Sequence, residues 1–193
     1  MFQQSTQQFC GLGPRGRRGC ARLGAFTMIE VLAVVLILGI ASAIIMPQFT
    51  SNGDLDAASA ARTVMADLLY AQNRAIATQQ NQYVTFNVTG QSYSLYNGSS
   101  AGPTTLLRHP VNQNNYVMTF GQAGPNNISS DVTLGSVSFN GQSTVAFDEL
   151  GTPYSYNSGA PSPLTQPGTI VLNSGSYCLT IRVTQDTGEI TVN

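Results

Sequence analysis

The most apolar segment of the chain runs from Phe26 to Met46 and contains one charged residue, Glu30. At about 1.5 Å per residue, a helix over this run is about 30 Å long, which is enough to cross a bilayer. A carboxylate inside such a span costs roughly 2.5–3.5 kcal/mol at its centre and less near its end. Glu30 is therefore expected to be paired, to be functional, or to lie at the level of the lipid headgroups.

A second helix is predicted from Leu55 to about Gln80, after a break at Ser51-Asn52-Gly53-Asp54. Asp54 or Ser51 can cap its N-terminus, and Asp56 in the first turn suits the helix dipole. The spacing predicts an amphipathic helix that lays an apolar stripe on a sheet. The predicted stripe consists of Leu55, Ala58, Met65, Leu68, Leu69, Gln72 and Ile76.

From residue 81 onward, short runs alternate between apolar and polar residues, which is typical of strands in an antiparallel sheet. The first two runs flank Thr89-Gly90-Gln91 and predict a hairpin. Stretches rich in Gly, Pro, Ser and Asn predict exposed loops at 98–103, 121–130 and 151–168. The predicted strands are Tyr83–Val88, Ser92–Asn97, Tyr116–Phe120, Val132–Phe139, Thr144–Phe147, Thr169–Leu172, Tyr177–Thr184 and Glu189–Val192.

Charge is unevenly distributed along the chain. Residues 1–25 hold four arginines and no acid, whereas residues 26–193 hold four arginines and nine acids, and Lys is absent throughout. The basic flank predicts a cytoplasmic N-terminus, with everything after Met46 on the other side of the membrane. The acidic remainder argues against a nucleic-acid partner, because binding to phosphates needs clustered Lys or Arg.

Three interpretations of the apolar run remain open on its pattern alone. A secretory signal would explain the basic start and the A-x-A-like site at Ala41-Ser42-Ala43, but the apolar residues continue to Met46. A plain membrane anchor would explain the run but not the residues around Glu30. The third interpretation rests on FTMIEVLAVVLILGIASAIIMP, which closely resembles the N-terminus of type IV prepilins and type II secretion pseudopilins.

This resemblance implies a maturation site. In that family a membrane aspartyl peptidase removes a basic leader after a small residue, and the new first residue, usually Phe, is N-methylated. With Phe26 as the first mature residue, Glu30 is the fifth and Pro47 the twenty-second, as in the family. Ala25 stands between Gly24 and Phe26 here. A cut after Ala25 keeps the family register, whereas the alternative cut after Gly24 makes Ala25 first and Glu30 sixth.

The resemblance also implies a role for Glu30 in assembly, in which its carboxylate meets the N-terminal amine of a neighbouring subunit. In a bundle of apolar helices an unpaired carboxylate is costly and an opposite charge attracts it strongly. The pair would therefore form in only one stagger between helices. Close helix approach is favoured by a run of small residues, namely Gly39, Ala41, Ser42 and Ala43.

Two further stretches resemble the minor pseudopilins of type II secretion and related minor type IV pilins. They are LLYAQNRAIATQQNQYVTFNV and the C-terminal half from VAFDELGTPYSYN to LTIRVTQDTGEITVN. The resemblance implies an α+β, pilin-like fold, with a long N-terminal hydrophobic helix packed on an antiparallel β-sheet domain. The expected parts are a leader (1–25), a transmembrane and assembly helix (26–47), an amphipathic continuation (48–80) and a periplasmic β-sheet domain (81–193).

The sequence offers no catalytic residues, no metal site and no cofactor site. His109 is the only histidine, and Asp148 and Glu149 would point to opposite faces of a strand. Cys178 lies in YCLTIRV, an alternating pattern that predicts a buried small hydrophobe.

The function expected from the resemblance is that of a minor pseudopilin, which helps assemble the filament that exports folded proteins. The expected partners are other pseudopilin or pilin subunits, the prepilin peptidase and methyltransferase, and the inner membrane. Two alternatives stay open: a minor type IV pilin, acting in filament initiation or DNA uptake, and a stand-alone membrane-anchored β binding module.

Overall fold

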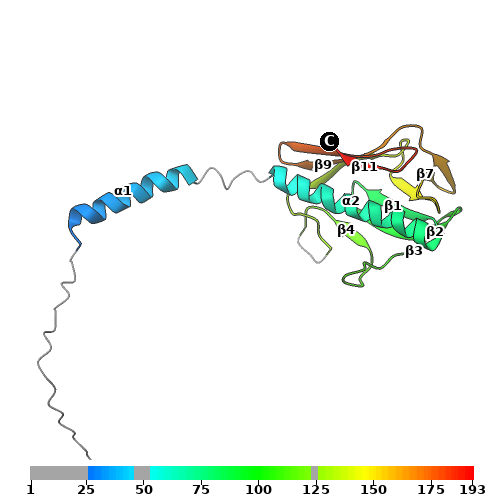
Figure 1. The fold of residues 1–193 in the computed structure, drawn as a ribbon, viewed down its shortest axis with the longest axis horizontal. Helices are drawn as coiled ribbons and strands as arrows, with labels where there is room; N and C mark the ends of the chain where they lie inside the picture. Colours follow the sequence, from blue (N-terminus) through cyan, green and yellow to red (C-terminus); the bar gives the residue numbers. More distant parts are fainter. Residues whose placement is uncertain (1–25, 46–52, 123–125) are drawn as a thin grey trace, which may run out of the picture. The chain divides into compact units, whose positions relative to one another are not determined.

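The computed structural model describes residues 26–45, 53–122 and 126–193 (Figure 1). The chain divides into two units, Met1–Pro47 and Gln48–Asn193, which are considered separately. The described part of the first unit contains helix α1, Met28–Ile45. Among the described residues, no helix is both long enough and apolar enough to span a membrane. Met46 and Pro47, which end the predicted span, lie outside the described residues.

The second unit begins with helix α2, Gly53–Thr78, close to the predicted limits. Its buried face matches the predicted one only in part, because Leu68 is fully buried whereas Leu55, Leu69 and Ile76 are 66%, 41% and 45% exposed. Small side chains let the helix lie close to the sheets, and Met65 of the predicted stripe packs partly buried against the core. The buried residues of α2 are Ala57, Ala60, Ala61, Val64, Asp67, Leu68, Ala71 and Ala75.

The strands form two antiparallel sheets. In the first the order is β3-β2-β1-β6-β7-β8, and β4 also pairs with β2; in the second the order is β11-β10-β9-β5. The first sheet comprises β1 Gln82–Asn87, β2 Ser92–Ser99, β3 Gly102–Leu106, β4 Val117–Thr119, β6 Thr144–Phe147, β7 Pro153–Asn157 and β8 Ala160–Pro163. The second comprises β5 Thr133–Ser138, β9 Gly168–Ser174, β10 Tyr177–Val183 and β11 Ile190–Val192. Each strand predicted from the alternating pattern is confirmed, with small differences at its ends.

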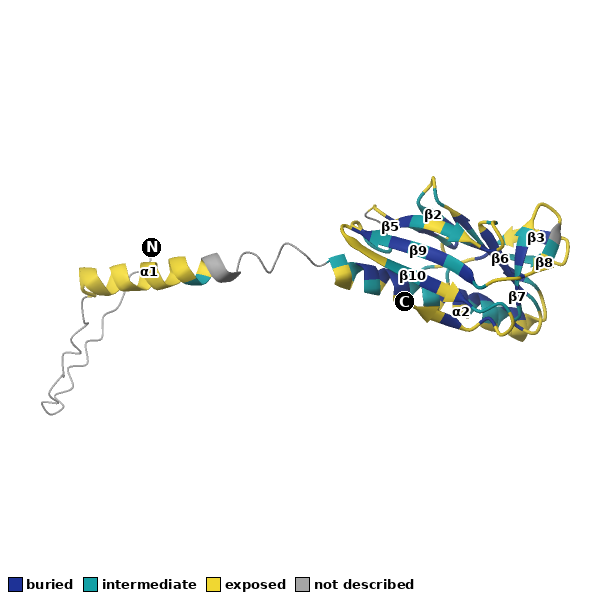
Figure 2. Ribbon diagram, turned by 90° about the horizontal axis from the view of Figure 1, so that it is seen from above, coloured by how far each residue is buried: buried dark blue, intermediate teal, exposed yellow. Residues whose placement is uncertain are grey.

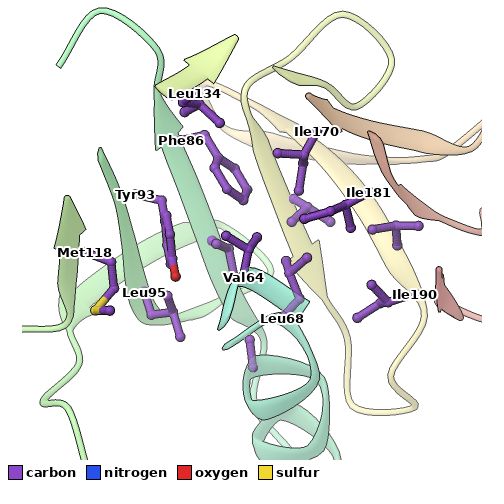
Figure 3. Close-up of a cluster of buried hydrophobic side chains, with 14 of the residues drawn as sticks. Val64, Leu68, Phe86, Tyr93, Leu95, Met118, Leu134, Ile170, Ile181 and Ile190 are labelled. Carbon is purple, nitrogen blue, oxygen red and sulfur yellow. The ribbon is translucent and has the colours of Figure 1, made fainter. Parts of the chain in front are cut away.

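The core lies where α2 packs on both sheets, contacting β1 and β6 of one and β9, β10 and β11 of the other. In Figure 3, Val64 and Leu68 of α2 point between side chains contributed by the two sheets. The β1–β2 hairpin supplies one side with Phe86 opposite Tyr93. Ile170 of β9 and Ile181 of β10, which are paired on adjacent strands of the second sheet, supply the other. One helix therefore joins two sheets into a single hydrophobic core.

The prediction of an exposed loop at 151–168 is wrong, because this segment contains β7 and β8. Ser155 of β7 pairs with Val145 of β6 and is 2% exposed. Strand β8 was not predicted because Pro161 and Pro163 lie within it, and proline is usually a signal against a strand. They are tolerated there because β8 is an edge strand, where missing N–H groups cost no ladder bond.

The prediction of an exposed loop at 98–103 is also wrong, because β2 continues to Ser99 and β3 begins at Gly102. This hairpin approaches the aromatic ring of Tyr83 closely. A Cβ added at Gly98 would come within 2.6 Å of that ring, so only glycine fits there without a shift. The third predicted loop, 121–130, contains no strand within its described residues 121–122 and 126–130.

The prediction that Cys178 is buried is wrong, since its thiol is exposed. Successive side chains of a strand point to opposite faces. In β10 the inward positions are Ile181 and Val183, both fully buried, with Leu179 half-buried. Cys178 has the opposite parity and points away from the core.

Candidate assembly sites

The N-terminus of α1 is capped by Thr27. The Glu30 N–H lies 3.0 Å from the Thr27 carbonyl oxygen and 3.3 Å from its Oγ1, and the Val31 N–H also donates to that carbonyl. Thr27 and Glu30 occupy the first and last positions of a capping-box pattern, of which the Oγ1 contact is one half. Glu30 therefore stands in the first helical turn, where the helix dipole favours a carboxylate.

Helix α1 is apolar on every described face, and those faces are exposed (Figure 2). Phe26 is 77% exposed, Ile29 73% and Leu36 61%. A helix that is hydrophobic all round is stable only when a membrane or other helices cover it.

The structure brings two of the predicted site residues together. Phe26 directly precedes the capping residue, and Glu30 lies in the turn that follows it. Gly24, Ala25 and Pro47 lie outside the described residues, so their predicted roles are not tested. Sequence reasoning did not single out Thr27, although the spacing Thr-x-x-Glu is a recognisable helix-start signal.

A second feature, in the middle of α2, also escaped the sequence analysis. Asp67 is 8% exposed, and its two carboxylate oxygens accept hydrogen bonds from different tyrosines. The Tyr93 hydroxyl donates to Oδ2 at 2.5 Å and the Tyr116 hydroxyl donates to Oδ1 at 3.0 Å. Burial raises the pKa of Asp67, and the two hydrogen bonds and nearby His109 partly oppose that rise. The carboxylate thus ties α2 to β2 and to the chain before β4.

The ring of Tyr116 contacts two other rings. It stacks on Tyr70 of α2 at a centroid distance of 5.7 Å and lies 4.7 Å from the His109 ring. Burial, followed by the neighbouring Asp67, raises the pKa of the Tyr116 hydroxyl. His109 thus packs beside Tyr116.

The remaining acidic candidates occupy turns. Asp148 follows β6, and its Oδ1 accepts from the N–H groups of Leu150 at 3.0 Å and Thr152 at 2.7 Å. Glu149 is exposed. Asp148 and Glu149 lie beyond the end of β6, and the side chain of Asp148 organises the turn that follows.

The predicted cap of α2 is only partly placed. The helix already includes Gly53, so Asp54 lies inside its first turn and does not precede it. The Asp54 Oδ1 accepts from the N–H of Leu55 at 2.8 Å. Ser51 lies outside the described residues. Asp56 is in the first turn, as predicted, where it suits the helix dipole.

Comparisons with known proteins agree with this architecture. A family profile described as "Type II transport protein GspH" matches residues 60–187, which is more than half of the chain. A search of curated proteins gave no match.

Among solved structures, one similar chain is the minor pseudopilin EpsH from the type II secretion system of Vibrio cholerae. It has 12% identity and a TM-score of 0.51, over 74% of this chain and 98% of that chain. Another is the type IV minor pilin FimU of Pseudomonas aeruginosa, with 16% identity and a TM-score of 0.46, over 72% of this chain and 90% of that chain.

The likeness to EpsH shows the α+β pilin-like fold, in which an N-terminal helix packs on antiparallel sheets. The family is one of non-enzymatic structural subunits that associate with other pseudopilins at the membrane and in the periplasm. Given the match of its profile across residues 60–187, the chain belongs to the GspH family of type II secretion minor pseudopilins.

Proposed function

We propose that the chain is made as a precursor and matured at its N-terminus before it joins a type II secretion pseudopilus. The prepilin peptidase cuts between Ala25 and Phe26 and removes the basic leader 1–25, and Phe26 is then N-methylated. Residues 26–47 hold the subunit in the inner membrane by a single pass. The N-terminus faces the cytoplasm, and the unit that begins with α2 lies in the periplasm.

The observation that carries this proposal is the character of α1. All its described faces are apolar and exposed, and its single carboxylate stands in the first turn, next to Phe26. A plain anchor requires the apolar faces but not a carboxylate at that position. A filament subunit uses both, because its helix passes from the membrane to a bundle of similar helices.

Glu30 then acts during assembly by pairing with the N-terminal amine of a neighbouring subunit. Cleavage creates this amine at Phe26, so an uncut precursor cannot offer it. The two charges attract strongly once water is excluded. Thr27 supports the arrangement by fixing the helix start, which holds the Glu30 side chain at a defined height in the bundle. Pro47, at the other end of the segment, is the second assembly residue implied by the family register.

Intact-mass analysis of the chain extracted from membranes tests the maturation step. The expected mass is that of residues 26–193 with one added methyl group. A retained Met1, or a chain starting at Ile44 after the Ala41-Ser42-Ala43 site, contradicts the proposal. A start at Ala25 changes only the cut site. Substituting Ala25 by a bulky residue such as Leu should leave the precursor uncut, because the peptidase selects small residues there.

A further inference from the structure

The chain between β3 and β4 projects from the edge of the first sheet. Both strands pair with β2, one after the other along its length. Between them, Leu107 donates its N–H to the Leu95 carbonyl at 2.9 Å, and Leu95 donates its N–H to the Tyr116 carbonyl at 3.1 Å. Both ends of this segment are therefore hydrogen-bonded to the same residue of β2, Leu95. The residues between them, 108–115, are called the 108–115 hairpin.

Hydrogen bonds within the 108–115 hairpin fix its conformation. His109 N–H donates to the Asn114 carbonyl at 2.8 Å, and Gln113 N–H donates to the His109 carbonyl at 2.9 Å. An Arg108 guanidinium nitrogen donates to the Gln113 carbonyl at 3.1 Å, and Val111 N–H donates to His109 Nδ1 at 3.3 Å. A segment ordered in this way loses little conformational entropy when it binds a partner.

The base of the 108–115 hairpin is tied to α2. The Tyr116 hydroxyl donates to the buried Asp67, and the Tyr116 ring contacts both Tyr70 and His109. His109 belongs to the hairpin itself. The hairpin is therefore held at a fixed position on the folded domain, whereas a typical surface loop has no such attachment.

The surface of the 108–115 hairpin differs from that of the rest of the domain. Val111 at its tip is 84% exposed, and Arg108 is also exposed. Residues 101–130 contain no acid, whereas residues 53–193 as a whole carry eight carboxylates and four arginines. An exposed aliphatic side chain beside a cation, on an otherwise acidic domain, suits an acidic partner with a small apolar depression.

We propose that the 108–115 hairpin docks on the outer domain of a neighbouring pseudopilin, with Val111 in an apolar depression and Arg108 opposite a carboxylate. The inference rests on the proposed function, because that function supplies a neighbour of this class. This contact lies in the outer domains and is separate from the pairing of Glu30 with an amine, so the two can fail independently.

Photo-crosslinking in cells that make the full set of pseudopilins tests the contact. The full chain carries p-benzoylphenylalanine at position 111 or, as a control, at position 150. Leu150 is a matched control because it is 83% exposed at the tip of another turn. The expected result is a crosslink from position 111 to a pseudopilin, at least about fivefold stronger than from position 150. No crosslink from position 111, or one only to a secreted or unrelated protein, overturns the proposal.

Charge reversal supplies a second measurement on the full chain. Arg108→Glu and Val111→Asp should each lower the yield of co-purified pseudopilin by about tenfold, at matched levels of processed protein. Arg182→Glu, at an exposed position of β10, should leave the yield unchanged. If the parent chain co-purifies and both hairpin variants do so equally well, only the hairpin proposal fails. If the parent chain itself co-purifies with no pseudopilin, the proposed function fails as well.

Discussion

The side-chain amide of Gln91 binds both backbone polar groups of Leu134. Its Oε1 accepts from the Leu134 N–H at 2.7 Å, and its Nε2 donates to the Leu134 carbonyl at 2.9 Å. The same Nε2 donates to the Val88 carbonyl at 2.7 Å. Gln91 lies in the β1–β2 turn of the first sheet and Leu134 in β5, an edge strand of the second. One amide thus substitutes for a missing strand partner and links the two sheets.

Replacing Gln91 by Ala should lower the free energy of unfolding of the outer domain by about 1–3 kcal/mol, because the part-buried backbone groups of Leu134 lose their partners. Gln91→Glu should also destabilise the domain, since a carboxylate cannot donate to the carbonyls of Leu134 and Val88. Urea unfolding of a chain beginning at Gly53 measures the change. Gln166→Ala, at an exposed position, is the control and should change stability by less than about 0.5 kcal/mol. Equal stability of the Gln91 and Gln166 variants contradicts this role.

The independent folding of that shortened chain is also a prediction. It should fold as a soluble α+β unit, because residues 48–193 form a compact unit with α2 covering both sheets. Circular dichroism with thermal unfolding checks this point. The expected result is a cooperative transition, and a non-cooperative one, or aggregation under all conditions, would count against the independent outer domain.

Asp67 should make the stability of the outer domain depend on pH. Burial raises its pKa above the ordinary value of 3.8, so the folded state binds the proton more tightly than the unfolded state does. The contribution of Asp67 to stability is therefore greatest below about pH 4 and falls as pH rises through the raised pKa. Asp67→Asn removes this titration and keeps the shape of the side chain.

The check is the difference in unfolding free energy between the parent and Asp67→Asn, measured by urea titration from pH 4 to pH 8. The unfolding free energy of the parent, relative to that of Asp67→Asn, should fall as pH rises. A relative unfolding free energy that does not change with pH, or that rises with pH, contradicts a raised pKa of Asp67 in the folded state. Asp67→Ala should destabilise the domain at every pH, because Tyr93 and Tyr116 lose their acceptor.

The face that α2 buries gives a test by volume. Ala61 is 1% exposed against the sheets, whereas Leu69 is 41% exposed on the other side of the helix. Ala61→Leu should destabilise the outer domain by about 1–3 kcal/mol through overpacking. Leu69→Ala should change the free energy of unfolding by less than about 1 kcal/mol. If Leu69→Ala destabilised the domain more than Ala61→Leu does, the face predicted from the sequence would be the buried one.

These contrasts show what the sequence could and could not predict. Strands with a clear alternation, such as Ser92–Asn97, were evident because their period is two. Strand β8 was hidden by its prolines, which only an edge position tolerates. The buried face of α2 was predicted only in part: Leu68 is buried as expected, but the alanines that make up most of that face were given too little weight. At Cys178 the alternation was recognised, but its phase could be settled only by the packing of Ile181 and Val183.

The candidate sites divide in the same way. Phe26 and Glu30 were proposed from a family resemblance over a contiguous segment, and the structure adds Thr27 as the helix cap between them. Asp67 gave no signal, because its partners Tyr93 and Tyr116 are distant in sequence. Nothing local distinguishes such a residue from an acid on the solvent face of a helix.

The central claim is that Glu30 pairs with the amine of a neighbouring subunit during assembly. Glu30→Ala should insert and be cleaved normally, since it removes a charge from an apolar helix. Assembly should fail, because breaking a buried pair from one side costs about 3–5 kcal/mol. Glu30→Gln should be intermediate at best, since an amide accepts a hydrogen bond without supplying charge. Thr27→Val, which weakens the cap but keeps the carboxylate, separates pairing from helix capping.

The most direct measurement is co-purification of the full chain with its sibling pseudopilins, together with a secretion assay, at matched levels of processed protein. The account predicts that Glu30→Ala loses both co-purification and secretion, whereas Thr27→Val retains most of each. If Glu30→Ala joins its partners and supports secretion as well as the parent chain does, Glu30 has no pairing role and the claim is contradicted.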